Sequence, residues 1–149
     1  MKKKTLWLLL SMVGASAWGQ KAVERSAILQ LHEWKQIYET YVPDAAVIDS
    51  LRNKVAGFRA DVYFGFWCDD SKKHVPVFLK IVDSLNVPEF AVNFFEVDKK
   101  SVSGQKYYAP GTLVEKVPTF IFYRRDSESG RIVENPKDSL LMDMMLIMF

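Results

Sequence analysis

Cysteine and histidine are scarce in this 149-residue sequence, which contains one cysteine, Cys68, and two histidines, His32 and His74. A single thiol cannot form an internal disulfide, so a disulfide-stabilised scaffold is excluded. One cysteine and two histidines far apart in the sequence make no recognisable set of metal ligands. The sequence also shows no glycine-rich phosphate loop and no Ser-His-Asp spacing. We therefore predict neither a metal site nor a cofactor.

A long apolar run is missing from the N-terminus, where residues 6–13 fall far short of the roughly 20 residues needed to span a bilayer. This stretch follows three consecutive lysines and precedes Ala17-Trp18-Gly19, which places small residues at both positions that a signal peptidase reads. Residues 1–19 are therefore predicted to be a cleaved signal peptide, not a membrane anchor. The mature chain should begin at Gln20, carry no membrane anchor and be periplasmic or secreted.

No excess of basic charge remains once this signal is removed. The whole chain has 20 lysines and arginines against 18 acidic residues, and losing the three lysines of the signal reduces the basic count to 17. A nearly neutral chain without a basic stripe binds nucleic acid poorly, so we predict no nucleic-acid partner. The composition, 49% hydrophobic and 13% aromatic, instead favours a packed globule of one domain.

Residue periodicity indicates alternating helices and strands. Aromatic and β-branched clusters predict strands over residues 61–67, 90–97, 118–123 and 131–134. Apolar residues recurring every three or four positions predict helices over residues 22–41, 44–57, 71–85 and 136–149, with a polar loop over 98–116. This order predicts an α/β fold with a parallel β-α-β unit and a hairpin. The central mixed sheet should have about four strands flanked by helices on both faces, with an extra N-terminal helix.

Cys68 stands at the junction between the first predicted strand and the helix that follows it. The N-terminus of a helix stabilises a thiolate through its free N–H groups and its dipole, whereas the neighbouring Asp69 and Asp70 oppose that charge. A lone cysteine in an exported chain indicates a reactive thiol, an intermolecular disulfide or a plain buried thiol. His74, a lone histidine beside two lysines, is expected on the surface.

Further residues around Cys68 form a known pattern: Trp67 precedes it, Pro76 follows it by eight positions, and Val117-Pro118-Thr119 opens a later strand. Together they resemble the thioredoxin family, whose Trp-Cys-x-x-Cys motif opens a helix and whose cis-proline opens the next-to-last strand. The resemblance covers residues 58–149, which should form the thioredoxin-like domain, with residues 20–57 as an N-terminal helical extension. It implies that Pro118 is cis and that Trp67, Val117, Pro118 and Thr119 bind an extended substrate segment.

The sequence also departs from the family at three positions. The second cysteine of the family falls at Ser71, and serine cannot resolve a mixed disulfide. The buried acid of the family falls at Val62, and the lysine often paired with that acid falls at Phe94. A standard dithiol reductase is therefore not expected.

Two functions remain open at this stage. The first is monothiol thiol–disulfide exchange, in which Cys68 reacts, Ser71 hydrogen-bonds its sulfur, and protein or small-molecule thiols and disulfides are the partners. The alternative is a non-catalytic thioredoxin-fold binding module that keeps the groove beside Pro118. The methionine-rich C-terminal helix is expected to pack in the core, with a partner or dimer surface as the alternative.

Overall fold

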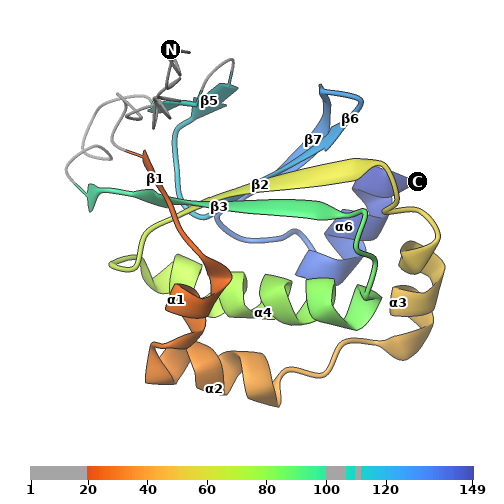
Figure 1. The fold of residues 1–149 in the computed structure, drawn as a ribbon, viewed down its shortest axis with the longest axis horizontal. Coiled ribbons are helices and arrows are strands. Elements are labelled where there is room, and N and C mark those ends of the chain that lie inside the picture. Colours follow the sequence, from red (N-terminus) through yellow and green to blue (C-terminus); the bar gives the residue numbers. More distant parts are fainter. Residues whose placement is uncertain (1–19, 100–106, 110–111) are drawn as a thin grey trace, which may run out of the picture.

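The computed structural model describes residues 20–99, 107–109 and 112–149, and the predicted signal peptide lies outside this range. A five-stranded mixed sheet runs through the molecule in the order β1-β3-β2-β6-β7 (Figure 1). The described helices lie together on one face of that sheet. The sequence pattern had predicted helices on both faces. Within the described residues, no helix has the length and apolar character needed to cross a membrane.

The centre of the sheet is β2 (Phe58–Phe64), which is buried along almost its whole length. It pairs in parallel with β3 (Ala91–Val97), and α4 (Asp69–Leu85) provides the crossover between them. On its other side β2 pairs antiparallel with β6 (Thr119–Arg124), which forms a hairpin with β7 (Ser127–Val133). The predicted β-α-β unit and hairpin are thus present, although β2 lies three residues before its predicted position.

A fifth strand, β1 (Gln20–Ala22), joins the edge of the sheet at β3. It runs antiparallel to β3, with Ala22 opposite Phe95. The N–H of Val23 continues the ladder by donating to the carbonyl oxygen of Phe94 at 2.9 Å. This strand was not predicted, because three residues are too few to show an alternating pattern.

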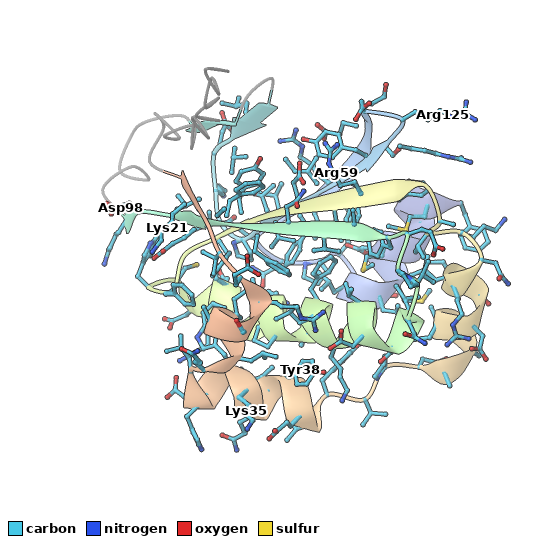
Figure 2. All side chains as sticks on the ribbon, viewed as in Figure 1. Lys21, Lys35, Tyr38, Arg59, Asp98 and Arg125 are labelled. Carbon is cyan, nitrogen blue, oxygen red and sulfur yellow. The ribbon has the colours of Figure 1, made fainter. Side chains whose placement is uncertain are left out.

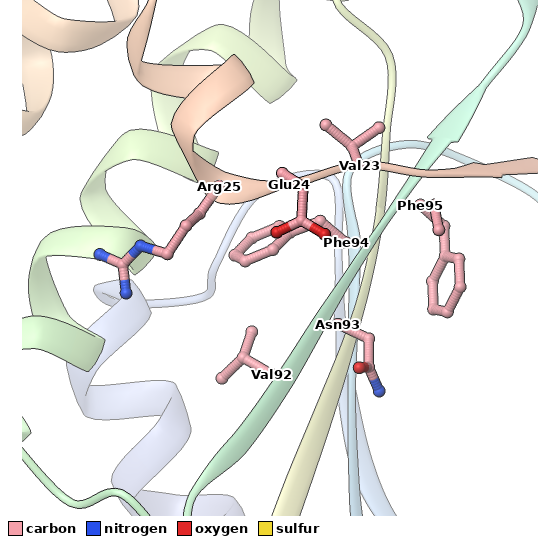
Figure 3. A pocket seen from close by; sticks show the side chains of 8 residues that line it. Val23, Glu24, Arg25, Val92, Asn93, Phe94 and Phe95 are labelled. Atoms are coloured by element: carbon pink, nitrogen blue, oxygen red, sulfur yellow. The ribbon is translucent and has the colours of Figure 1, made fainter.

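Beyond Val23 the chain leaves β3, and a cavity of about 350 Å³ lies at this point of departure. Figure 3 shows Glu24 and Arg25 on the departing chain and successive β3 side chains pointing to opposite sides of the strand. Among the described residues, the cavity therefore lies where the edge of β3 loses its hydrogen-bonded neighbour β1.

The predicted helix over residues 22–41 is two helices, α1 (Arg25–Leu29) and α2 (His32–Thr40). The break falls at Leu31, whose extended backbone (φ −76°, ψ 119°) caps α2. The helices on the two sides of the break both bind Asp83 on α4. Arg25 pairs with Asp83 at 2.6 Å, and the hydroxyl of Tyr38 donates to the same carboxylate at 2.6 Å.

Two more helices complete this layer. In α3 (Ala45–Arg52), the side chain of Asp44 caps the N-terminus by accepting hydrogen bonds from the N–H groups of Ala46 and Val47. The final helix, α6 (Leu140–Met148), begins later than predicted because Ser139 caps it. The buried Asp143 holds the preceding turn by accepting from the N–H of Lys137 at 2.7 Å.

The main core lies between the sheet and the helices. Phe78 of α4 is fully buried there, and its ring lies 5.1 Å from that of Phe120 and 6.2 Å from that of Phe122. Phe94 joins the same group, with 6.4 Å between its ring and that of Phe78. The methionine-rich helix was predicted to pack in the core, and it does so in part, because Met144 is fully buried there.

The opposite face of the sheet carries a smaller apolar cluster, formed by Tyr63, Val97, Val114, Val117 and Ile121. Arg59 projects from the sheet on this side (Figure 2). A two-stranded hairpin, β4 (Tyr107–Ala109) and β5 (Thr112–Val114), contributes to it where a loop was predicted. The glycines and proline around this segment obscured its strands in the sequence.

Candidate functional site

Cys68 is the N-cap residue of α4, with extended backbone dihedrals (φ −98°, ψ 123°). A turn closes immediately before it, because its N–H donates to the carbonyl oxygen of Gly65 at 3.0 Å. Its side chain is half-buried and contacts the smaller apolar cluster. The thiol donates to the carbonyl oxygen of Val117, with 3.3 Å between the two atoms.

The loop that meets this sulfur is the predicted Val117-Pro118-Thr119 segment. The peptide bond between Val117 and Pro118 is cis, the conformation expected from the sequence. Thr119 is 1% exposed, and its hydroxyl donates to the carbonyl oxygen of Lys116 at 2.6 Å. Residues 49 positions apart in the sequence are thereby brought into contact at Cys68 and Val117.

Trp67 lies on the exposed side of the site. Its side chain is 38% exposed, yet the indole N–H is held by the carbonyl oxygen of Val97 at 2.9 Å. Lys99 lies over the same ring at 5.9 Å from its centroid. The indole is therefore fixed at the end of β3 while more than a third of the residue stays exposed, an arrangement that suits contact with a bound chain.

Ser71 lies on the buried side of the site and is fully inaccessible to solvent. Its hydroxyl oxygen accepts a hydrogen bond from the N–H of Gly65 at 3.2 Å. The sequence suggested that Ser71 would bond to the sulfur of Cys68; the hydrogen bond formed in the structure instead joins α4 to the turn after β2. Ser71 thus holds the turn that positions Trp67 and Cys68.

Gly65 is a site residue that the sequence did not single out. A Cβ atom at this position would lie 2.6 Å from Cε2 and Nε1 of the Trp67 indole. That spacing is too short for a Cβ atom against the atoms of a ring, so glycine is what allows the indole to lie across the backbone. The available signal was a glycine directly between a buried strand and Phe66-Trp67-Cys68.

Gly65→Ala should therefore expel the indole of Trp67 from its position and break its hydrogen bond to Val97. We expect a red-shifted tryptophan fluorescence and a loss of about 1–3 kcal/mol in unfolding free energy, as for overpacking. Fluorescence spectra and urea denaturation measure both. Gly57→Ala is a useful contrast, since its Cβ would meet nothing within 4 Å although its φ of +83° carries backbone strain. An unchanged spectrum in Gly65→Ala would contradict the assignment.

Val62 and Phe94, which replace the acid and lysine of the family, are neighbours across β2 and β3. Val62 is fully buried and Phe94 is 6% exposed, and both belong to the main core. The positions that handle protons in the family are thus an apolar pair in this chain.

Charged groups surround the exposed side of Cys68. Asp69 and Asp70 occupy the first turn of α4. Lys72 lies 3.9 Å from Asp69 and 3.0 Å from Glu33 of α2, and its hydrogen bond to Glu33 raises the pKa of Lys72.

In the smaller apolar cluster, burial raises the pKa of Tyr63, and nearby Asp61 adds to the effect.

His74 was expected on the surface, and this prediction was wrong. The residue is 7% exposed, and its Nε2 lies 3.0 Å from Oδ1 of Asn135 in the segment before α6. Its place on the inner face of α4 explains the burial. In the described part of the chain, no group of three or more His, Cys, Asp or Glu residues is arranged to hold a metal ion.

The comparisons with known proteins agree with this architecture. The family model for thioredoxin matches residues 19–144. A solved structure of a protein of unknown function from Pseudomonas aeruginosa is similar, with a TM-score of 0.61 and 12% identity over 85% of this chain and 91% of that one. No curated protein matches the chain in sequence. Since the family match spans most of the chain, including the Trp67-Cys68 turn and the Val117-Pro118 loop, the protein belongs to the thioredoxin family.

Proposed function

We propose that this thioredoxin-family chain is an exported monothiol protein that exchanges disulfides through Cys68. One observation carries the proposal: the half-buried sulfur of Cys68 lies at the N-terminus of α4 and 3.3 Å from the Val117 carbonyl oxygen beside cis-Pro118. Free N–H groups and a positive dipole end at that place favour a sulfur anion. The other members of the predicted site hold this arrangement in place.

The proposed reaction consists of two successive thiol–disulfide exchanges. Cys68 gives its thiol proton to water, and its sulfur attacks one sulfur of a partner disulfide. The partner S–S bond breaks, a Cys68–partner disulfide forms, and the other partner sulfur leaves as a thiolate. No second thiol exists in this chain, so an external thiol must attack the adduct and release Cys68.

Trp67 and Val117 contribute to binding in this proposal. The thiol of Cys68 gives up its hydrogen bond to Val117 when it reacts, which frees that carbonyl to accept an N–H from an extended partner segment. The exposed part of Trp67 offers an apolar surface to the same segment. Thr119 acts indirectly, because its bond to Lys116 braces the loop.

The alternative, a binding module without turnover, has its own support. The chain lacks a resolving cysteine. Ser71 is fully buried, and the apolar side chains of Val62 and Phe94 cannot transfer protons. A protein of this kind would use the same loop to bind partners.

Reaction of the purified mature protein with neutral 2,2′-dithiodipyridine tests the first step. We expect stoichiometric release of pyridine-2-thione and a matching mass increase, both absent in Cys68→Ala. Turnover is then measured with hydroxyethyl disulfide as substrate and reduced glutathione as the resolving thiol. Acceleration above the Cys68→Ala background supports exchange, adduct formation without acceleration supports the binding module, and absence of any adduct rejects a reactive Cys68.

The intact mass of the exported protein tests the predicted export, and it should place the first residue at Gln20.

A further inference from the structure

A second recess adjoins Cys68, on the side of the N-terminal helices and separate from the loop at Pro118. It is a cavity of about 310 Å³ whose lining includes Cys68 and an apolar wall of Leu31, Trp34 and Phe66. The rings of Trp34 and Phe66 lie 5.3 Å apart, and Trp34 is 2% exposed. This volume is near the lower end of the roughly 300–1,000 Å³ found for small-molecule pockets, so it suits one or two side chains.

The break between α1 and α2 shapes the mouth of this cavity. Leu31, at the break, is left 41% exposed beside the cavity instead of being covered by its own helix. An apolar side chain entering beside Leu31 would be taken out of water by that leucine and by the aromatic wall behind it. The cavity therefore has an accessible apolar entrance within reach of the sulfur.

The rim of the cavity has more negative than positive charge. Lys72 stands between two carboxylates, 3.0 Å from Glu33 and 3.9 Å from Asp69. His32 is the remaining polar residue of the lining. A cationic group on the ligand complements this rim, whereas an anionic group is repelled by it.

We propose that this cavity is a specificity subsite of Cys68, which receives an apolar side chain of a partner protein at a position adjacent to the partner's cysteine and flanked by a basic residue. The inference rests on the proposed function, because it names the substrate class for the same thiol. Apolar contact with Leu31 and the aromatic wall selects the side chain, and Glu33 and Asp69 select the charge.

The test uses cysteine peptides activated as 2-pyridyl disulfides, with the sequences Lys-Leu-Cys-Leu-Lys, Glu-Leu-Cys-Leu-Glu and Lys-Gly-Cys-Gly-Lys. In each reaction the sulfur of Cys68 attacks the peptide sulfur, the peptide–pyridyl S–S bond breaks, and pyridine-2-thione leaves. Its absorbance gives the rate, and 2,2′-dithiodipyridine provides a reference rate without a peptide. We expect the first peptide to react about tenfold faster than either of the others.

Two variants with matched controls locate the preference. Leu31→Gln should remove the preference for leucine over glycine, while Leu146→Gln, at a leucine that is 73% exposed on α6, should not. Glu33→Gln combined with Asp69→Asn should remove the preference for lysine over glutamate, while Glu39→Gln on α2 should not. Leu31→Gln and the two control variants should keep the wild-type rate with 2,2′-dithiodipyridine. Asp69→Asn removes a charge that opposes the thiolate, so the peptide rates of the double variant are each divided by its own reference rate before they are compared.

The outcomes distinguish failure of the subsite inference from failure of the proposed thiol–disulfide exchange. Equal rates for the three peptides in the wild type, beside a normal reference rate, overturn the subsite and leave the proposed function intact. A preference that survives in both site variants also overturns it, because the selecting residues then lie elsewhere. Failure of the wild type to react with 2,2′-dithiodipyridine rejects the proposed function, and the subsite inference with it.

Discussion

Replacing Ser71 by cysteine should give a protein that forms an internal disulfide and reduces insulin in the presence of a chemical reductant. Positions 68 and 71 are three residues apart at the start of α4, and side chains at this helical spacing are neighbours. Their Cβ atoms should come within the range that a disulfide requires. The wild type has one thiol and should show almost no activity, so this substitution has the largest expected effect on function.

The activity gained should stay below that of an ordinary thioredoxin. Val62 and Phe94 still replace the groups that transfer protons, and Asp69 and Asp70 still oppose a thiolate at Cys68. The substitution also weakens the acceptor for the N–H of Gly65, which should cost about 1 kcal/mol of stability.

Two controls accompany this variant. Ser71→Ala loses the same hydrogen bond without adding a sulfur, and it should be destabilised but inactive in insulin reduction. Cys68→Ala combined with Ser71→Cys should also be inactive. A Ser71→Cys protein that oxidises only between molecules would show that Ser71 does not occupy the position of the second cysteine.

Phe78→Ala should cause the largest loss of stability among the substitutions considered. The Phe78 side chain is fully buried, and its ring contacts those of Phe94, Phe120 and Phe122. Truncation removes these contacts and leaves a cavity between α4 and the sheet, for which about 3–5 kcal/mol is typical. Since domains of this size have about 5–15 kcal/mol in total, the variant should unfold at a much lower urea concentration.

Phe149→Ala is the matched control, because its side chain is 70% exposed. The ring there contacts Lys54 at 4.7 Å from its centroid, an exposed interaction of about 0.5–1 kcal/mol. Equilibrium urea unfolding followed by circular dichroism measures both variants. Similar losses in the two proteins would show that the aromatic group around Phe78 does not dominate the core.

The parts of the fold that could be predicted from sequence are those with local signals. The buried run of β2, the periodicity of α4 and the hairpin of β6 and β7 each have a pattern of their own. The cis peptide bond before Pro118 was anticipated because the motifs around Cys68 and Pro118 together resemble one known arrangement.

The features that escaped prediction depend on contacts between distant residues. The break at Leu31 lies between two helices that both bind Asp83, through Arg25 and Tyr38, and no glycine or proline marks it in the sequence. His74 is buried because α4 turns that face toward the segment before α6. The bond between Ser71 and Gly65 and the cavity beside Cys68 likewise exist only once the elements have packed.

The short strand β1 has a consequence for aggregation. It pairs with β3 only from Phe95 to Val97, and a strand held by so few backbone hydrogen bonds opens at a small free-energy cost. When β1 detaches, all of β3 becomes an unpaired edge, to which a strand of another molecule can add. Asn93 and Glu96 place polar groups along that strand and make such addition less favourable. The few residues of β1 thus help to keep the sheet from pairing with its copies.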